Sequence, residues 1–400
     1  MTPDPLNDVV AGQYRKWVYP EPIADLPSWL ENNWQWFDPS HAHRMFWPDR
    51  DYMPGMDILV AGCGTSQAAV FAYTNPGAHV VAIDVSQPSI DHHQYLKERY
   101  GLQNLDLHLL PVEDVGSLGR DFDLVVATGV LHHLADPGSG MQALAGCLRP
   151  EGVAAIMVYA RYGRMGVGIL QSVFRDLGIG QDETSLAVVR ETIASLPQDH
   201  PLMSYLPLAP DLHSDAGLVD TFLHGRERSY TVDDCLDLVA SSGLTFQDWF
   251  LKSPYYPPEP PGSGLYAEIA ALPREQQWAM MERINTRNAC HFFLACRTDR
   301  PQGKYRIDFA SPDILDAVPA FRYRCGIGNG AVFRPDWRMS LDPARAALVQ
   351  NVDGRRTIRE IAATAGEKGL LSRRRPFESE ESARSLFQSL WQRDFISIGL

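Results

Sequence analysis

The stretch D-I-L-V-A-G-C-G-T-S-Q at residues 57–67 decides the fold of this chain. Its apolar first half predicts a buried strand, and Gly62-Cys63-Gly64 predicts a tight turn into a helix. Such a turn brings unpaired backbone N–H groups at the helix start close to a ligand. A dinucleotide-binding loop usually carries a third glycine where this chain has Gln67. The loop by itself leaves two interpretations open, a cofactor loop or a tight turn without a ligand.

β-rich runs recur after this loop and alternate with stretches that can form helices. The predicted strands are Ile58–Ala61, His79–Ile83, Leu105–Leu110, Phe122–Ala127, Val153–Tyr159, Leu244–Leu251 and His291–Arg297. Because strands that alternate with helices form βαβ units, we predict an α/β fold with a seven-stranded, mostly parallel sheet and flanking helices. The rhythm is lost between the fifth and sixth strands, which predicts an insertion after strand five.

Changes in composition divide the chain into three parts. Residues 1–50 mix aromatic residues with prolines and are interpreted as an N-terminal helical leader. Residues 51–299 carry the strands and are predicted to form the main domain, with the insertion at 160–240. Residues 300–400 are predicted to form a small, mainly helical C-terminal domain, because the composition turns basic near residue 300.

The overall composition excludes several classes of protein. With 400 residues, of which 45% are hydrophobic and 21% charged, the chain can bury large cores. We find no apolar run of about 18 residues and no signal-peptide pattern, so we expect a cytoplasmic protein without a membrane partner. The six cysteines show no C-x-x-C spacing, which predicts reduced thiols rather than disulfides or a zinc site.

Charge is distributed unevenly along the chain. Residues 1–299 hold 19 Lys and Arg against 37 Asp and Glu, whereas residues 300–400 hold 17 against 12. Because phosphate contacts need clustered Lys and Arg, we expect no nucleic-acid partner for the main domain. The basic tail leaves that question open.

Two further features of the sequence narrow the choice of ligand for the glycine loop. Asp84 ends the second predicted strand, twenty residues after Gly64, where an acid can accept both hydroxyls of a ribose. This pair still permits NAD. The fourth strand then runs into V-L-H-H-L at 130–134, and L-R-P-E-G at 148–152 precedes the fifth.

With these motifs, residues 57–160 resemble the class I, Rossmann-like S-adenosylmethionine-dependent methyltransferases. The resemblance implies a glycine loop beneath the methionine part of the cofactor, an acid on the ribose hydroxyls, and residues after the third strand that border the adenine. S-adenosylmethionine is therefore the expected cofactor. The residues expected to bind it are Ala61, Gly62, Cys63, Gly64, Gln67, Asp84, Val85, Val112, Glu113, Asp114, Thr128, Gly129 and His132.

The loop departs from the family pattern at two positions. Many members carry an acid two residues before the first glycine, which serves the amino group of the cofactor. This chain has Val60 at that position, so another group must take over the contact. Gln67 replaces the third glycine. Because a sulfonium cofactor carries no pyrophosphate, this substitution fits S-adenosylmethionine better than NAD.

Methyl transfer from a sulfonium is an in-line displacement, so the protein must mainly align the nucleophile, the methyl carbon and the leaving sulfur. A hydroxyl or ammonium acceptor must also lose a proton. His132 and His133 follow strand four, at the sheet edge where ligands of open α/β folds bind. Each is a candidate base or a packed residue that satisfies backbone groups, and we name His133 as a catalytic candidate.

The insertion contains a dense block of ionisable residues at 211–230. It allows three interpretations: a helical surface pair of Asp220 and His224, a metal site formed by His213, Asp215 and His224, or a substrate pocket. The metal set matches no known ligand spacing, so we predict no metal and favour the pocket. The catalytic candidates from this block are His213, Asp220 and His224, and the candidate substrate-binding residues are Tyr159, Arg161, Asp215, Arg226 and Arg228.

Other signals concern the surroundings of this pocket. A mouth lined by arginines 161, 164, 226 and 228 would suit an acidic small molecule. Tyr14, Trp17 and Tyr19 either cap the cofactor or staple the leader to the core. The segment D-T-F-x-H at 220–224 is similar to part of bacterial proteins whose core carries a so-called methyltransferase regulatory region, some of which modify protein lysines. This resemblance places the segment near the active site.

Residues 341–363 resemble the small winged-helix units of the peptide-chaperone type, in which a D-G turn joins two helices. Three roles stay open for the C-terminal domain. It binds a peptide or partner, it binds nucleic acid through Arg355, Arg356, Arg359 and the arginines at 373–375, or it is passive with solvated charges.

Two classes of function follow from the sequence. The first is a methyltransferase that transfers a methyl group from S-adenosylmethionine to a small molecule or a protein side chain, with a homodimer as a possible assembly. The second is a non-catalytic module that binds S-adenosylmethionine without consuming it and contacts a peptide or partner through its C-terminal domain.

Overall fold

The computed structural model describes residues 5–258, 264–367 and 376–400. The arginines at 373–375 lie outside these described residues. The chain forms two compact units. One comprises Met1–Phe37, Pro54–Phe246 and Glu282–Asp299, and the other comprises Asp38–Met53, Gln247–Met281 and Arg300–Leu400. The predicted boundaries after residues 50 and 299 stay a prediction.

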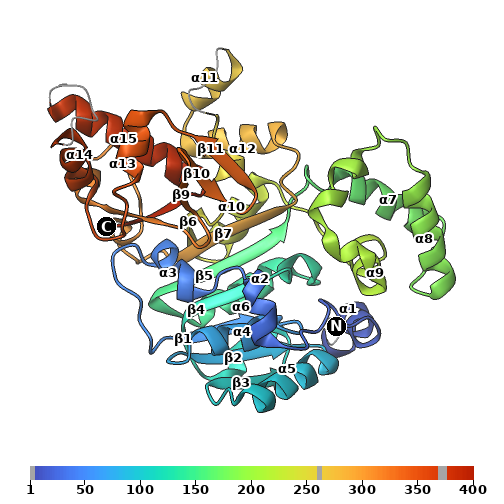
Figure 1. Cartoon of the computed structure of the whole chain (residues 1–400). Coiled ribbons are helices and arrows are strands. Elements are labelled where there is room, and N and C mark those ends of the chain that lie inside the picture. Colours follow the sequence, from blue (N-terminus) through green and yellow to red (C-terminus); the bar gives the residue numbers. More distant parts are fainter. Residues whose placement is uncertain (1–4, 259–263, 368–375) are drawn as a thin grey trace. The chain divides into compact units, whose positions relative to one another are not determined.

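A seven-stranded sheet runs through the first unit in the order β3-β2-β1-β4-β5-β7-β6 (Figure 1). The strands are β1 (Asp57–Ala61), β2 (His79–Asp84), β3 (Leu105–Leu109), β4 (Phe122–Thr128), β5 (Leu148–Tyr159), β6 (Leu244–Trp249) and β7 (Cys290–Arg297). The neighbours β3-β2, β2-β1, β1-β4 and β4-β5 pair in parallel, whereas β7 pairs antiparallel with β5. The predicted Rossmann-like, mostly parallel sheet is therefore confirmed.

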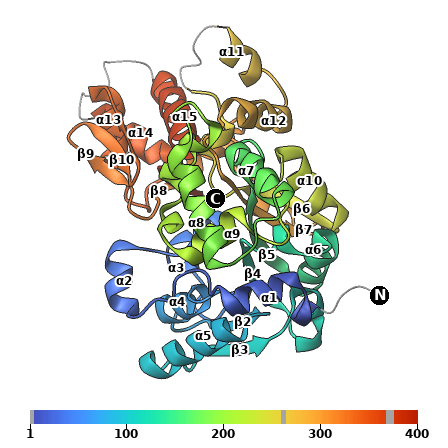
Figure 2. The ribbon, with the colours of Figure 1, turned by 90° about the vertical axis from the view of Figure 1, so that its right-hand side faces the viewer.

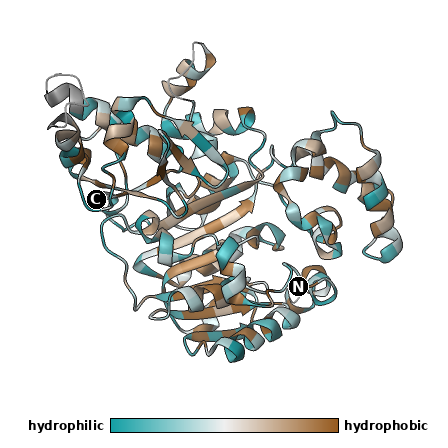
Figure 3. Ribbon diagram, in the orientation of Figure 1, coloured by the Kyte–Doolittle hydropathy of each residue, from teal (hydrophilic) through white to brown (hydrophobic). Residues whose placement is uncertain are grey.

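The central strands are continuous apolar runs because a parallel sheet is covered on both faces. Figure 3 shows this hydrophobic colour along the strands. Val60 lies in β1 opposite Ala82 of β2 and Val126 of β4, and its side chain is fully buried. An acid at this position would need a partner for its charge, because an unpaired buried charge is costly. Burial is the physical reason that a valine suits this site.

The helices around the sheet of the first unit begin at capping side chains, except the one after Ser66, whose side chain makes no capping hydrogen bond. They are α1 (Val9–Lys16), α2 (Leu26–Asn32), α4 (Gln67–Thr74), α5 (Gln87–Tyr100), α6 (Pro137–Gly146) and α10 (Val232–Ser241). Helix α5 is typical: the Ser86 side chain caps its first turn, Pro88 lies in that turn, and Gly101 ends it in the left-handed conformation (φ 64°). These caps fix where the loops at the carboxyl ends of the strands start.

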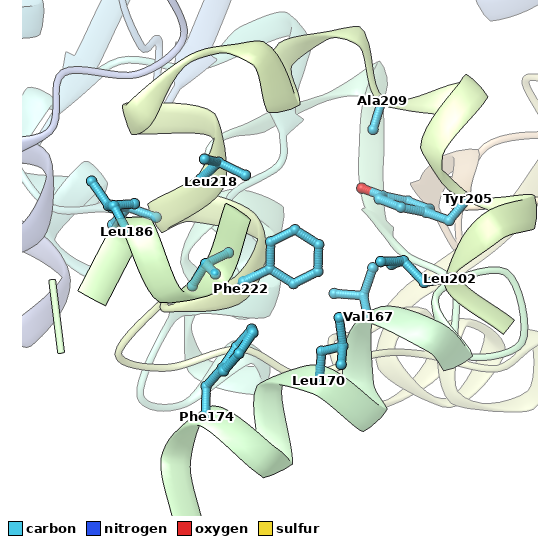
Figure 4. Close-up of a cluster of buried hydrophobic side chains, with 11 residues drawn as sticks. Val167, Leu170, Phe174, Leu186, Leu202, Tyr205, Ala209, Leu218 and Phe222 are labelled. Atoms are coloured by element: carbon cyan, nitrogen blue, oxygen red, sulfur yellow. The ribbon is translucent and has the colours of Figure 1, made fainter. Parts of the chain in front are cut away.

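The insertion leaves the sheet at Ala160 and returns at Tyr230, where the two residues form a parallel bridge. Its helices are α7 (Met165–Asp176), α8 (Glu183–Ser195) and α9 (Asp215–Phe222), and they enclose an apolar cluster of their own (Figure 4). Phe222 lies in its middle, edge-to-face with Phe174 at a ring distance of 6.3 Å. This core holds α9 firmly, and Figure 2 shows α9 close to α1.

The second unit contains α3 (Pro39–Phe46), α11 (Leu265–Ala270) and most of α12 (Arg274–Ile284). Its C-terminal part has two small antiparallel sheets. One pairs β8 (Val318–Phe321) with β12 (Ile396–Gly399), and the other contains β9 (Gly326–Gly328), β10 (Ala331–Arg334) and β11 (Trp337–Ser340). The helices of this part are α13 (Pro343–Val349), α14 (Ile358–Glu367) and α15 (Pro376–Gln392).

The turn between α13 and α14 is built by Asp353 and Gly354. The Asp353 carboxylate accepts the N–H groups of Arg355 and Arg356, and Gly354 has φ 74°. Two helices joined by a D-G turn were predicted, but the winged-helix assignment stays a prediction. Within the described ranges, none of the helices combines the length and the apolar character needed to cross a bilayer.

Candidate functional site

A cavity of about 550 Å³ opens at the carboxyl ends of the parallel strands in the first unit. Its walls come from the segments at the ends of β1, β2, β3 and β4, from the last residues of β5, from residues 5–20 and from α9. Its lining residues include Asp8, Tyr14, Gly62, Gly64, Asp84, His133, Tyr159 and Asp220. Its volume is that of a site for a cofactor-sized ligand.

The glycine loop forms one wall of the cavity. Glycine is required at two of its positions because neighbouring side chains come very close to the backbone. Gly62 has φ 68°, and a Cβ there would lie 2.3 Å from a methyl group of Val130. Gly64 has φ 54°, and a Cβ there would lie 2.9 Å from the Pro20 ring. Larger residues would therefore strain the backbone and push the loop into the cavity or the leader.

Asp84 ends β2 and is held by the same loop. One carboxylate oxygen accepts the N–H of Gly64 at 2.9 Å, and the other accepts the N–H of Ser86 at 2.8 Å. Burial nevertheless raises the pKa of Asp84 to about 6. This carboxylate lines the cavity and changes its charge close to neutral pH.

Gln67 serves the scaffold rather than the cavity. Its side-chain N–H donates to the carbonyl of Trp36 at 3.2 Å and to the hydroxyl of Thr128 at 3.1 Å. The glutamine thus ties the leader to the end of β4, and it does not line the cavity. A glycine could not make this link.

Asp220 presents a buried carboxylate to the end of the cavity next to β5. It accepts the hydroxyl of Tyr14 at 2.7 Å and the hydroxyl of Tyr159 at 3.3 Å. Burial raises the pKa values of Asp220 and of both tyrosines. Helix α9 positions the carboxylate, since Gly217 in its first turn packs directly on the Asp211 carbonyl, where a Cβ would lie 2.1 Å away.

Two stacked histidines lie beside Asp220. The rings of His133 and His224 are 3.8 Å apart with 19° between their planes. The His133 Nδ1 lies 2.9 Å from the carbonyl oxygen of Arg226, and the Arg226 N–H donates to the His224 Nδ1 at 3.0 Å. Burial lowers the pKa of each histidine to about 3, so both rings are neutral at pH 7.

His132 packs under this site. Its ring stacks on Tyr159 at 3.9 Å, and the guanidinium of Arg164 lies 3.6 Å from the centre of the Tyr159 ring. Both ring nitrogens of His132 are buried without a hydrogen-bond partner, and burial lowers its pKa well below 6.5. His132 does not line the cavity, so its contacts are those of a packed residue.

The ligand atoms of His133, Asp220 and His224 lie within 4.8 Å of one another, which resembles a metal site. A metal ion must lie near the plane of each imidazole that binds it. Two rings stacked face to face cannot aim their lone pairs at one ion without a large rotation. The stacking therefore argues against a metal centre in this arrangement.

The structure places the predicted residues His213 and Asp215 outside the cavity, and His224 does not line it either. His213 is exposed on the turn before α9 and contacts the carbonyl of Pro210. Asp215 is half exposed and pairs with Arg190 on α8. Both side chains belong to the surface of the insertion, because the face of α9 that points inward carries Asp220 instead.

The predicted cation-lined mouth does not form. Arg161 and Arg228 are exposed and share Asp234 at 3.1 and 3.4 Å, while Arg164 is buried against Glu227 at 3.0 Å. Arg226 pairs with Asp8. Each guanidinium contacts a carboxylate of the chain, and none of the four arginines lines the cavity.

The cavity is instead acidic. Six carboxylates line it, from Asp8, Asp84, Glu113, Asp114, Asp136 and Asp220, and none of the described lining residues is a lysine or an arginine. Only Asp8 among them forms an ion pair with an arginine in the described structure. A cavity with this lining attracts cations.

Comparisons with known proteins agree with this geometry. Residues 59–154 match the family model described as "Methyltransferase domain". An uncharacterised protein from Synechococcus sp. is 29% identical over 364 residues, which cover 88% of this chain and 86% of the relative. The tRNA 5-carboxymethoxyuridine methyltransferase of Escherichia coli is 34% identical over 108 residues, covering 26% of this chain and 41% of the enzyme.

The fold itself has a solved counterpart. PKMT2 from Rickettsia typhi superposes with a TM-score of 0.66 over 91% of this chain and 76% of the other, at 15% identity. The same protein has been solved in complex with AdoHcy.

This chain contains a class I S-adenosylmethionine-dependent methyltransferase domain.

The chain thus uses S-adenosylmethionine as its cofactor and catalyses methyl transfer. The cavity of the methyltransferase domain fits this cofactor in volume and charge, because the bound sulfonium and ammonium groups are cationic and the walls are acidic. The residues predicted for the cofactor divide into two groups. Gly62, Gly64, Asp84, Val85, Val112, Glu113, Asp114, Thr128 and Gly129 line the cavity, whereas Ala61, Cys63, Gln67 and His132 lie behind its wall.

Sequence reasoning missed some lining residues of the methyltransferase domain. Met157 lines the cavity on the same face of β5 as Tyr159, so the two-residue period of a strand could have found it. Asp8 caps α1 by accepting the N–H groups of Val10 and Ala11, and an N-cap pattern could have marked it. No sequence signal connects Asp8 with the cavity.

Proposed function

We propose that this methyltransferase transfers the methyl group to an amine that enters the cavity as an ammonium ion. The observation that carries this proposal is the Asp220 carboxylate, buried between the hydroxyls of Tyr14 and Tyr159 in a cavity without lysine or arginine side chains among its described lining residues. A carboxylate favours an ammonium group, whereas it repels a carboxylate or phosphate acceptor.

The cofactor is proposed to lie along the loops from β1 to β4. Gly62 and Gly64 would support its methionine part, Asp84 would accept the ribose hydroxyls, and Val112 with Glu113 would border the adenine. When bound, S-adenosylmethionine supplies an electrophilic methyl group. In the proposed reaction the chain holds the acceptor in line with that group and removes the acceptor's proton.

Asp220 is proposed to bind the ammonium and to take up its proton, since only the neutral amine has a free electron pair. Burial raises the pKa of this carboxyl group, which makes it a better proton acceptor than an exposed aspartate. The neutral rings of His133 and His224 add no positive charge that would repel the acceptor. The tyrosine hydroxyls keep the carboxylate in place.

A lysine side chain is the acceptor that we propose first. The D-T-F-x-H segment at 220–224 is similar to part of bacterial proteins, some of which modify protein lysines. It spans the end of α9 and the two residues after it, and it carries both Asp220 and His224. A small primary amine has the same reacting group and would meet the same carboxylate. The proposal is therefore amine chemistry, and lysine is its protein form.

Binding of S-adenosylmethionine is expected to depend on pH through Asp84. Its pKa is raised to about 6 by burial, and only the ionised carboxylate accepts both ribose hydroxyls well. Affinity should therefore be constant above about pH 7 and fall about tenfold per pH unit below about pH 6. Isothermal titration between pH 5 and 8 measures this. A dissociation constant that does not change over this range contradicts the proposed contact.

The chemistry of the product tests the proposed function. A cell extract is incubated with the protein and methyl-labelled cofactor, and labelled protein and small-molecule fractions are treated with mild base. We expect label that survives base and appears as methyl-lysine after acid hydrolysis, or as a methylated small amine. Base-labile label, which indicates a methyl ester, or label in RNA would overturn the amine proposal. Cofactor that binds but is never consumed would instead support the non-catalytic module.

A further inference from the structure

The segment after α9 is attached to α1 at three adjacent points. The guanidinium of Arg226 pairs with the Asp8 carboxylate, and the N–H of Gly225 donates to the side-chain oxygen of Gln13 at 3.2 Å. A Cβ at Gly225 would lie 2.5 Å from a methyl group of Val9, so the backbone passes directly over α1. The contacts with α1 therefore help to hold Gly225 and Arg226 in place.

The main chain of Arg226 imposes a different proton arrangement on each of the two stacked histidines. A carbonyl oxygen only accepts, so the His133 Nδ1 facing the Arg226 carbonyl must carry the proton. A backbone N–H only donates, so the His224 Nδ1 that receives it must be the unprotonated nitrogen. Because both rings are neutral, their Nε2 atoms have opposite roles: a free electron pair on His133 and an N–H on His224.

These roles suit the positions of the two rings. His133 lines the cavity, so its electron pair at Nε2 is available to an acceptor group there. The His224 Nε2 is buried without a hydrogen-bond partner, and one ring nitrogen of His224 lies within 4.8 Å of an Asp220 carboxylate oxygen. The charged or titratable groups around the His133 ring are Tyr14 of α1, His132, Tyr159 of β5, Arg164, Asp220 of α9, His224 and Arg226.

We propose that Arg226 is a positioning residue: its main chain holds His133 and His224 in complementary tautomers, and its side chain couples this arrangement to Asp8 on the N-terminal segment. The proposal rests on the proposed function only in placing the acceptor at the His133 end of the cavity. Closure of α1 over the cavity then completes the hydrogen-bonding pattern that meets the acceptor. An open leader would leave the two imidazoles free to exchange tautomers.

The tautomers are tested by NMR on the full chain with ¹⁵N-labelled histidine, assigned with the variants His133→Gln and His224→Gln. In the wild-type protein we expect the Nδ1–H form of His133 and the Nε2–H form of His224, which long-range ¹H–¹⁵N correlations distinguish. The opposite tautomer at either residue overturns the proposal. This readout contains no acceptor, so it can fail or succeed whether or not the product is a methylated amine.

The coupling to the leader is tested with Asp8→Asn and Arg226→Met. Asparagine keeps the cap of α1 and removes the charge, while methionine keeps the Arg226 main chain and removes the guanidinium. Each variant is expected to show mixed tautomers at both histidines and about a tenfold lower kcat. Arg226→Met, which changes no lining residue, should keep the Kd of S-adenosylmethionine within about twofold. The double variant with both substitutions should be no slower than the slower of the two single variants, because all three proteins lack the same ion pair between residues 8 and 226.

Asp299→Asn is the matched control, since it removes an exposed ion pair with Arg297 away from the cavity and should change none of these quantities. Melting curves show whether the variants are folded. Folded variants that keep both wild-type tautomers would overturn the coupling, even if kcat falls. The wild-type spectrum keeps the tautomer assignment falsifiable if a variant does not fold.

Discussion

Asp220→Asn is expected to lower the rate of methyl transfer by about 100- to 10,000-fold and to leave the Kd of S-adenosylmethionine within about twofold. Asparagine has the shape of aspartate and can still accept the Tyr14 hydroxyl, but it carries no charge and takes up no proton. The loss should therefore appear in kcat for the amine acceptor. Single-turnover kinetics with saturating labelled cofactor measures the chemical step directly.

The chain offers a matched control for this variant. Asp211 belongs to the same insertion and accepts the hydroxyl of Tyr19 at 2.7 Å, as Asp220 accepts that of Tyr14, but it does not line the cavity. Asp211→Asn should retain most of the wild-type rate. If the two variants lose activity equally, the effect comes from the packing of the leader and not from the charge in the cavity. An Asp220→Asn variant with normal turnover would remove Asp220 from the proposed site.

Asp84→Asn is expected to weaken the binding of S-adenosylmethionine about 10- to 150-fold, or about 1.5–3 kcal/mol. The carboxylate already accepts the N–H groups of Gly64 and Ser86, and its remaining electron pairs are those proposed for the ribose hydroxyls. An amide replaces one acceptor oxygen by an N–H group, so it loses either a ribose contact or the hold on the glycine loop. Isothermal titration gives the Kd, and the pH dependence below pH 6 should vanish in this variant.

Asp91→Asn on α5 serves as the control for Asp84→Asn. Asp91 is exposed and accepts only the side chain of Gln87 among the hydrogen bonds found in the described structure. Its replacement should leave the Kd unchanged. Equal weakening in both variants would mean that total charge, and not the contact at the end of β2, controls binding. A melting curve of the ligand-free Asp84→Asn protein shows whether the fold is kept.

The sheet and the cofactor could both be predicted from the sequence. Strand β1 and the turn at Gly62 are local patterns, because a strand buried on both faces needs a continuous apolar run and a tight turn needs a residue that tolerates positive φ. Asp84 is equally local, since it ends the next strand at a fixed distance from the loop. Such features depend on neighbours within a few residues, which is why they could be predicted.

The side chains around Asp220 are brought together only in the tertiary structure. Tyr14 meets Asp220 across 206 residues, and His133 stacks on His224 across 91 positions of chain. The same packing turned the predicted arginine mouth into closed ion pairs and placed Gln67 between Trp36 and Thr128. The charge of a side chain can be read from the sequence, but the partner that uses this charge is set by long-range packing. For that reason the sequence predicted the cofactor through its family resemblance, whereas only the tertiary structure shows which side chains meet around Asp220.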